Sequence, residues 1–238
     1  MGIDPSVLDY LLGLAPQFPR GTERSVLELG ESMTLGIDLA GHLTKIAAVT
    51  GHDISSLEND LAACRRQPPQ RVGFEEARAI YKWIFNCTDY FAIDNGSDDP
   101  KYRRDLNYPI TLGRQFDIMI NNGTSEHIFN QANVFQIMHD HTKTGGFMIH
   151  YTVGLGWLDH GFYNVQPHFF LDLSKYNRYE LVSCAYVNTL TTFPLRPGEF
   201  SLEQIAANSR LADALLCACL RRQSDAAFCY PTQYLWAV

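Results

Sequence analysis

The sequence predicts an α/β fold in which helices cover both faces of a mainly parallel sheet. Short apolar runs that suit buried strands alternate with longer segments whose apolar residues recur at helical spacing. This alternation is typical of parallel sheets. In addition, polar residues follow directly on several of the apolar runs. Such residues are expected where parallel strands end at a ligand site.

The first half of the chain contains two predicted strands separated by a long helical region. Residues 25–30, "SVLELG", form a short buried strand that ends at a glycine. Residues 31–70 are expected to form a helical insertion. Residues 74–87 have helical spacing, with two glutamates in the first turn, where the helix dipole favours acids. Residues 89–94, "DYFAID", form a strand that ends in an acid.

The second half continues the alternation and becomes less regular. Strands are expected at residues 116–121 and 147–153, with a helix between them that "GG" stops. Residues 179–188 form a long strand, residues 201–223 a helical segment and residues 225–238 a final strand. The last two strands are mixed in polarity, as expected for a sheet edge with an antiparallel member.

Composition indicates a globular protein of 238 residues, and one domain with an insertion is the natural expectation. Hydrophobic residues make up 46% of the chain and the net charge is −7. Basic residues cluster only in pairs, which disfavours nucleic acid as a partner. No apolar run approaches the ~20 residues of a membrane span. Without a secretory signal, the six cysteines are expected to be reduced and mostly buried in a cytoplasmic protein.

The stretch "FDIMINNGTSEH" joins a buried strand directly to polar residues. Asn121, Asn122 and Gly123 come at the end of this strand, where a parallel sheet opens into its ligand site. The acid–histidine pair Glu126 and His127 follows at once. The polar residues therefore predict a site at this point of the sheet.

The succession of "VLELG", "YFAID", "DLNYPI", "FDIMINNGTSEH" and "HTKTGGFMIHY" resembles class I S-adenosylmethionine-dependent methyltransferases. The resemblance covers roughly residues 25–187. It implies a Rossmann-like, mainly parallel seven-stranded sheet with helices on both faces and an antiparallel C-terminal edge strand. It also implies a single methyltransferase domain over residues 1–238, with S-adenosylmethionine as cofactor and S-adenosylhomocysteine as product.

The resemblance assigns a role to each candidate cofactor residue. Gly30 lets backbone approach the amino acid end of the cofactor, Asp94 accepts hydrogen bonds from the ribose hydroxyls, and Asp105 lies at the adenine rim. The other candidates are polar or flexible residues near the strand ends, namely Glu28 and Glu31 for the ammonium group, and Asn121, Asn122 and Gly123.

The chain departs from the family pattern in two ways. Ser32 and Thr34 stand where the first loop usually has further glycines. About 60 residues separate Gly30 from Asp94, where about 20 are common. Residues 33–70 are therefore interpreted as an insertion, or as a lid over cofactor or substrate.

The acceptor side of the site is expected after the strands at residues 116–121 and 147–153. His127 and His160 are the candidate catalytic bases. A general base is needed when the methyl acceptor arrives protonated and is a weak nucleophile. The candidate substrate-binding residues are Glu126, His150, Tyr151, Trp157, Tyr163 and Asn164. Structural alternatives remain open: Glu126 and His127 could cap a helix, His150 could be a core histidine, and the aromatic loop at residues 154–170 could merely be packed.

No metal site is predicted. The "HDH" run at residues 139–141 suggests one, but residues two apart on a helix diverge, and no third ligand has suitable spacing.

The function predicted is methyl transfer to an oxygen or nitrogen of a small organic acceptor, since a negative net charge and an aromatic loop suit such a molecule. Two alternatives stay open. A degenerate methyltransferase fold could serve as a binding or scaffolding protein, and an NAD-dependent oxidoreductase would also use Asp94 but lacks the G-x-G-x-x-G turn. The acceptor and the oligomeric state, which could be a homodimer, are left open.

Overall fold

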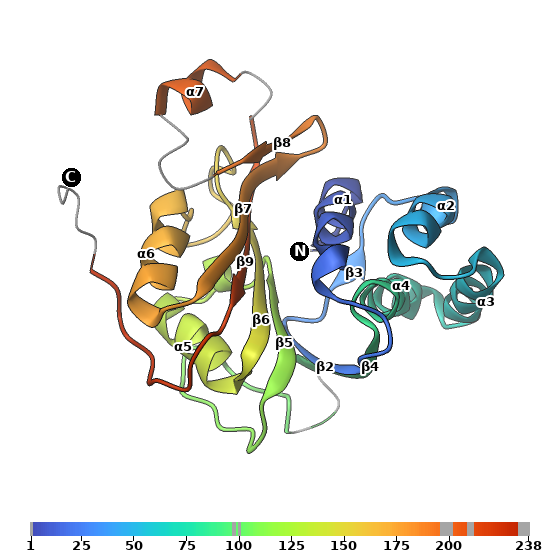
Figure 1. The fold of residues 1–238 in the computed structure, drawn as a ribbon, viewed down its shortest axis with the longest axis horizontal. Coiled ribbons are helices and arrows are strands. Elements are labelled where there is room, and N and C mark those ends of the chain that lie inside the picture. The colour runs from blue at the N-terminus through green and yellow to red at the C-terminus, as the bar shows by residue number, and fades with distance from the viewer. Residues whose placement is uncertain (1, 97–98, 100, 196–201, 209–211, 233–238) are drawn as a thin grey trace.

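A seven-stranded sheet forms the centre of the computed structural model, which describes residues 2–96, 99, 101–195, 202–208 and 212–232 (Figure 1). The strand order is β4-β2-β5-β6-β9-β7-β8. In that order the strands are Cys87–Ile93, Arg24–Leu29, Phe116–Asn122, Thr142–Val153, Leu215–Arg221, Glu180–Asn188 and Thr191–Pro194. A second, two-stranded parallel sheet joins β1 (Gly2–Ile3) to β3 (Met33–Thr34).

The sheet is mainly parallel, as predicted. Strands β4, β2, β5 and β6 pair in parallel. Strand β9 is antiparallel to both of its neighbours, β6 and β7, and β8 is antiparallel to β7. The antiparallel edge strand of the sheet is therefore β8.

Helices cover both faces of the sheet, which also confirms the prediction (Figure 1). One face carries α1 (Pro5–Leu14) and α4 (Pro69–Phe85), with α2 (Leu39–Thr50) and α3 (Ile54–Arg65) packed outside them. The other face carries α5 (Gln131–His141) and α6 (Pro167–Asn177). A short helix, α7 (Leu202–Ala207), lies beyond β8.

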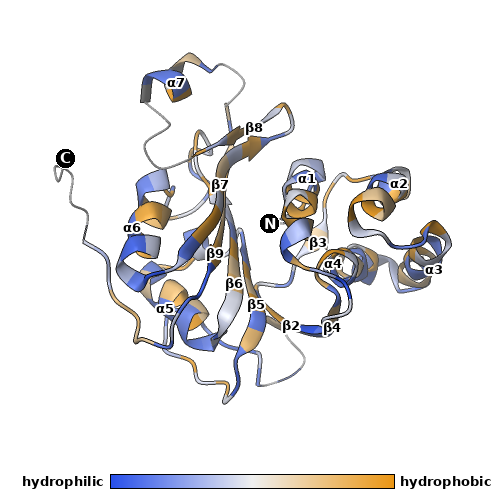
Figure 2. Cartoon of the chain, in the orientation of Figure 1, coloured by the Kyte–Doolittle hydropathy of each residue, from blue (hydrophilic) through white to orange (hydrophobic). Residues whose placement is uncertain are grey.

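The alternation of side chains along each strand divides the core into two layers. In β5, Ile118 and Ile120 pack into the layer under α1 and α4, whereas Met119 packs into the layer under α5 and α6. Hydrophobic residues are concentrated on the central strands and alternate with hydrophilic ones on the helices (Figure 2). Burial on both faces explains why these strands read as continuous apolar runs in the sequence.

The end of the chain differs from the prediction. Residues 215–221, expected to be helical, form strand β9 between β6 and β7. The antiparallel C-terminal strand therefore lies inside the sheet and not at its edge. Residues 225–232, expected to be a strand, have no regular structure, and the rest of that predicted strand lies outside the described residues.

The region between β2 and β4 is mainly helical, as the sequence predicts, although the short strand β3 also lies in it. Helices α2 and α3 fill it before α4 begins at Pro69. Residues 105–110, "DLNYPI", contain no strand, and β4 is an edge of the sheet. Among the described residues, none of the helices has the length and apolar character needed to cross a membrane.

Candidate active site

The carboxyl ends of β2 and β4 meet at a tight turn that begins with Gly30. The Gly30 amide donates to the Ile93 carbonyl oxygen at 2.8 Å, and the Glu31 amide donates to Asp94 Oδ2 at 3.1 Å. Gly30 has a φ of 76°, and a Cβ there would collide with the Thr124 hydroxyl. Gly30 is therefore required both by its backbone angle and by the close approach of Thr124.

Asp94 lines a cavity of about 360 Å³ at the β4 edge. The cavity is bordered by the rings of Phe91 and Tyr102, which stack with centroids 4.7 Å apart. Asp94 accepts backbone hydrogen bonds from Glu31 and from Gly96, the latter at 2.7 Å. Two carboxylate oxygens offer about four lone-pair positions, and donors among the described residues occupy two of those on Asp94. This residue set fits a ribose beside an aromatic wall.

Glu31 also lines this cavity, but two arginines hold its carboxylate. Arg71 donates to both oxygens at 2.9 and 2.7 Å, and Arg78 donates to Oε1 at 2.7 Å. These hydrogen bonds and charges lower the pKa of Glu31 even though partial burial opposes the shift. An ammonium group would therefore have to compete with two guanidinium groups.

Glu28 does not fit the predicted contact with the cofactor. Its side chain is fully buried and accepts four hydrogen bonds. Two come from Ser32, from the amide at 3.0 Å and from the hydroxyl at 2.5 Å. The hydroxyls of Tyr81 and Tyr90 supply the others, each at 2.6 Å. All lone-pair positions are occupied, so Glu28 instead fixes the turn after β2. Burial raises its pKa, and the donors oppose the rise.

Asp105 also departs from the prediction. It is exposed, and its Oδ1 accepts hydrogen bonds from the amide and the side chain of Asn107 in its own loop. It is not among the residues that line the Asp94 cavity. With no strand at residues 105–110, nothing carries Asp105 toward the strand ends.

The two asparagines that end β5 point to opposite faces of the sheet. Asn121 donates to the Ser125 hydroxyl at 2.8 Å and accepts from the Ser125 amide, so it braces the turn that follows. Asn122 donates to the Ser32 hydroxyl at 2.7 Å, and its Oδ1 is buried without a partner. Gly123 has a φ of 64° and donates to the Tyr151 carbonyl oxygen.

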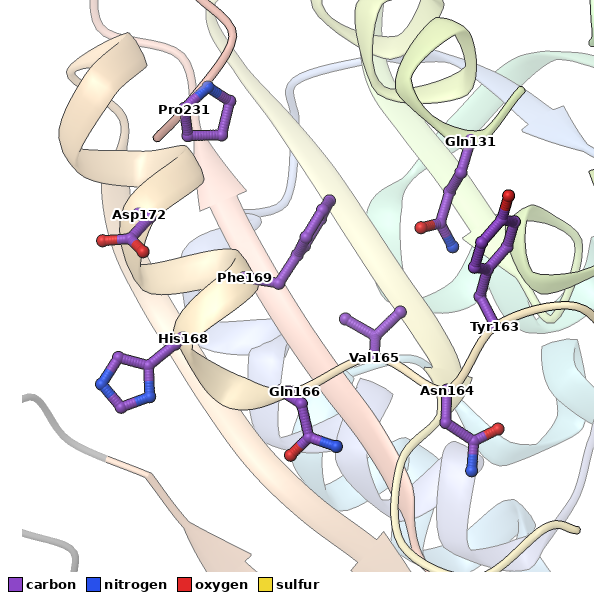
Figure 3. Close-up of a pocket in the computed structure, with 9 residues that line it drawn as sticks. All are labelled: Gln131, Tyr163, Asn164, Val165, Gln166, His168, Phe169, Asp172 and Pro231. Carbon is purple, nitrogen blue, oxygen red and sulfur yellow. The ribbon is translucent and has the colours of Figure 1, made fainter. Parts of the chain in front are cut away.

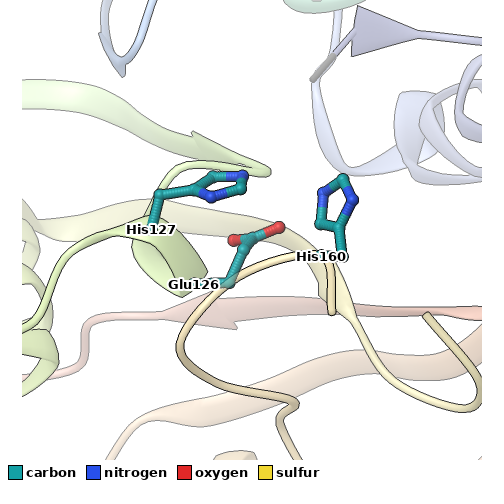
Figure 4. Close-up of side chains that lie close together, drawn as sticks. All are labelled: Glu126, His127 and His160. Atoms are coloured by element: carbon teal, nitrogen blue, oxygen red, sulfur yellow. The ribbon is translucent and has the colours of Figure 1, made fainter. Parts of the chain in front are cut away.

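Beyond this turn the structure brings together Glu126, His127 and His160 (Figure 4). Glu126 and His127 belong to the 3₁₀ turn η2 (Ser125–His127), and His160 belongs to the loop after β6. One potential ligand atom from each residue lies within 4.8 Å of the other two, and the histidine rings are 5.1 Å apart. The two residues predicted as catalytic from distant parts of the sequence are therefore neighbours.

Burial changes the proton affinities in this cluster. It raises the pKa of Glu126 to about 7. It lowers the pKa of His127, and the charge of His160 lowers it further. Glu126 Oε1 and His160 Nε2 are buried and have no hydrogen-bond partner among the residues that the structure describes. Unsatisfied polar atoms are uncommon in folded proteins, and a water, an ion or a catalytic role can account for one.

The loop after β6 is held against this cluster. The Phe162 amide donates to the Glu126 carbonyl oxygen at 2.8 Å. The Trp157 ring meets the His160 ring edge-on, with centroids 5.1 Å apart. Asn164 donates to two carbonyl oxygens of its own loop, at 3.2 and 2.8 Å. The aromatic loop thus positions His160.

Tyr163 and Asn164 line a second cavity of about 370 Å³, between the loop and the starts of α5 and α6 (Figure 3). Tyr163 donates to the Phe129 carbonyl oxygen at 2.8 Å, and Phe169 forms part of the opposite wall. This cavity shares no lining residue with the Asp94 cavity.

His150 and Tyr151 do not fit the predicted role in substrate binding, because both are fully buried. His150 packs between the rings of Phe135 and Phe170, and desolvation lowers its pKa to about 3. Tyr151 faces the other layer and contacts Tyr10 edge-on. His150 is therefore a histidine of the core, which was the structural alternative to a role in substrate binding.

The "HDH" histidines make structural hydrogen bonds. His139 contacts the Tyr179 hydroxyl at 2.6 Å and the Ala226 carbonyl oxygen at 2.9 Å. His141 contacts the Leu112 amide and the Ile137 carbonyl oxygen.

Three residues of the site were not predicted from the sequence. Thr124 closes over the Gly30 turn by donating to the Leu29 carbonyl oxygen at 2.6 Å. Arg71 and Arg78 also contact Glu75, at the i,i+4 and i,i+3 spacings that link charges on one helix face. The sequence shows the spacing of these residues on the helix, but it does not show that both arginines contact Glu31.

Comparisons with known proteins give matches only among solved structures. No protein-family model matches the sequence, and no curated protein matches it. The N-methyltransferase NodS from Bradyrhizobium japonicum, in complex with S-adenosylhomocysteine, is 13% identical. Its TM-score is 0.45, over 91% of this chain and 86% of that chain.

Two further structures are similar at the same level. An O-methyltransferase from a trans-AT polyketide synthase multienzyme of Brevibacillus brevis is 9% identical, with a TM-score of 0.43 over 93% of this chain and 73% of that chain. The 1,6-didemethyltoxoflavin-N1-methyltransferase of Burkholderia thailandensis is 13% identical, with a TM-score of 0.44 over 91% and 77%. Such values describe a distant likeness of fold, from which no activity follows. The seven-stranded, mainly parallel sheet with helices on both faces is the architecture that the sequence predicts.

Proposed function

We propose that the protein transfers a methyl group from S-adenosylmethionine to an oxygen or nitrogen of a small organic acceptor. One observation carries the proposal. The Gly30 turn, the Asp94 cavity and the cluster of Glu126, His127 and His160 all follow carboxyl ends of the parallel strands. In α/β sheets of this kind ligands bind outside those ends.

The residues assigned to the cofactor are those that line the Asp94 cavity and could accept a hydrogen bond or stack against a ring. Asp94 would accept hydrogen bonds from the ribose hydroxyls, and Phe91 and Tyr102 would border the adenine. Gly30 lets the turn approach closely, although the Thr124 hydroxyl lies where a Cβ of residue 30 would stand. When bound, S-adenosylmethionine supplies an electrophilic methyl group on a sulfonium.

His127 and His160 would contact the acceptor and orient its nucleophilic atom. His127 is exposed, so a molecule from solvent can reach the cluster. Phe129 and Phe162 stand beside it, 71% and 64% exposed, with their rings edge-to-face at 5.7 Å. Exposed aromatic rings at a polar site suit a small, partly apolar acceptor. Alignment of two reactants can alone supply about 7–11 kcal/mol of rate enhancement.

Ligand-induced stabilisation tests the proposal directly. A ligand at 100 times its dissociation constant stabilises the folded state by about 2.7 kcal/mol. We expect S-adenosylhomocysteine to raise the melting temperature and NAD to leave it unchanged. Stabilisation by NAD alone would favour the oxidoreductase alternative.

A second candidate, a binding or scaffolding protein with a degenerate site, is favoured by one observation. Glu28 is saturated by protein donors, and Thr124 occupies the approach to Gly30. This candidate requires that neither ligand shifts the melting temperature. Transfer of a labelled methyl group from S-adenosylmethionine to a small molecule in a cell extract would exclude it.

A further inference from the structure

We propose that Glu126, His127 and His160 together bind one divalent transition-metal ion. The three side chains supply two imidazoles and one carboxylate, with ligand atoms that all lie within 4.8 Å of one another (Figure 4). In a tetrahedral site with bonds of about 2.1 Å, ligand atoms stand about 3.4 Å apart. Rotation of the exposed His127 side chain and a small movement of the His160 loop would close the difference. With the ion in place, His127 and His160 would act on an acceptor through the metal and not by direct contact; metal binding itself does not depend on the proposed methyl transfer.

The unpartnered atoms of the cluster support a bound ion independently of the distances between the three side chains. Glu126 is completely buried, and its Oε1 has no hydrogen-bond partner. Its other oxygen accepts a long hydrogen bond of 3.3 Å from the Thr152 hydroxyl. His160 Nε2 is buried and equally without a partner. A cation bound between these two atoms and the second imidazole would satisfy both of them.

The surrounding chain restricts the ligands to this arrangement. Gly161 lies so close to the η2 turn that a Cβ would stand 2.8 Å from the Glu126 carbonyl oxygen and 3.3 Å from His127 Nδ1. The absence of a side chain there lets His160 reach its two partners. The contact of Trp157 with the His160 ring limits the rotation of that ring. Neighbours that orient the ligands in this way typically accompany metal sites.

The ligand set indicates the kind of metal. Imidazole nitrogens suit zinc, iron, copper and nickel, whereas magnesium and calcium prefer oxygen ligands. Three protein ligands also leave at least one position open for water or for an oxygen of a small molecule. Because His127 is exposed, that position can be reached from solvent.

Calorimetric titration of the full chain, freed of metal with a chelator, tests the inference. We expect Zn²⁺ to bind with a stoichiometry of one, Mg²⁺ to give no binding at the same concentration, and Co²⁺ to bind with visible absorption typical of nitrogen and oxygen ligation. His160→Ala and His127→Ala should each weaken Zn²⁺ binding by about a hundredfold or more, because only two ligands remain. His168→Ala, a histidine replacement outside the cluster, should keep the affinity within about twofold.

The outcomes separate this inference from the proposed function. If the wild-type protein does not bind Zn²⁺, or if His160→Ala binds it as tightly as the wild type, the metal site does not exist. Glu126→Gln provides a third test if it folds, as judged by circular dichroism. If it does not, the two histidine variants decide the matter, since neither histidine is fully buried. Binding of S-adenosylhomocysteine by the metal-free protein would support methyl transfer whatever the result with Zn²⁺.

Discussion

Asp94 is the residue on which the cofactor assignment most depends. We predict that Asp94→Asn weakens binding of S-adenosylhomocysteine by about 1.5–3 kcal/mol, the usual contribution of a hydrogen bond to a charged group. Asp105→Asn is the matched control, because Asp105 is exposed and bonded within its own loop. Calorimetry should find the control within about twofold of the wild type. Equal losses in the two variants would mean that neither acid holds the ribose.

Glu28 should make the stability of the protein depend on pH in a defined direction. Burial raises the pKa of this carboxyl above its ordinary value of 4.5. The folded state therefore binds the proton more tightly than the unfolded state, and this contribution to stability is present at low pH and lost as pH rises from about 4.5 through the folded pKa. Glutamine cannot ionise, so Glu28→Gln removes the effect.

The measurement is the free energy of urea unfolding of the two proteins between pH 4 and pH 8. We expect the wild type to lose stability relative to Glu28→Gln as pH rises, by at most about 1.4 kcal/mol per pH unit. A wild type that gains stability over the variant with rising pH would show that the four donors outweigh burial.

Single residues show why part of the site was predictable and part was not. Gly30, Asp94, His127 and His160 follow predicted strands, so the ends of those strands locate them in outline. The saturation of Glu28 was not predictable, because its donors Tyr81 and Tyr90 come from α4 and β4, more than 50 residues away. A single sequence does not reveal such partners.

Two glycines allow a test at the scale of elements. Gly161 lies where the loop after β6 meets η2, and a Cβ would stand 2.8 Å from a backbone oxygen. Gly161→Ala should therefore destabilise the fold by about 1–3 kcal/mol, as overpacking does. It should also speed hydrogen exchange of the Phe162 amide, which donates to Glu126.

Gly13 is the opposite case. It is exposed in α1, and a Cβ there would meet nothing within 4 Å. Gly13→Ala should stabilise the protein by about 0.5–1 kcal/mol, because alanine loses less backbone freedom on folding. Urea unfolding measures both variants. A neutral Gly161→Ala would show that the loop does not pack closely on the turn.

Strand β9 shows where the local hydrophobic pattern predicted the wrong secondary structure. Its sequence, "LLCACLR", consists largely of leucine, alanine and cysteine and follows a helical segment. Leucine and alanine are strong helix formers. Leu215, Cys217 and Cys219 pack into one layer, and Leu216, Ala218 and Leu220 into the other. A strand buried on both faces shows no alternation of polarity, so periodicity does not distinguish it from a buried helix.

The distribution of the cysteines is a property of the whole molecule. All six are free thiols, as expected, and five of them are buried. Burial raises the pKa of Cys64 and Cys87 to about 11 and of Cys184 to about 12. Reaction depends on the thiolate, so only the exposed Cys229 should react quickly with a thiol reagent in the native protein.

Quantification with Ellman's reagent at pH 8 tests this distribution. We expect one fast thiol per chain before unfolding and six in denaturant. Cys229→Ser should have no fast thiol. A fast second thiol in the native protein would indicate that one of the two core layers opens on the time scale of the assay.

The place of β9 between β6 and β7 has a consequence for biosynthesis. A ribosome releases β6 and β7 before β9, so the nascent chain has two central strands whose shared neighbour has not yet been made. Those strands expose unpaired backbone groups, which invite pairing with other chains. The sheet can close only when residue 221 has left the ribosome tunnel. Until then, we expect the growing chain to need shielding by a chaperone.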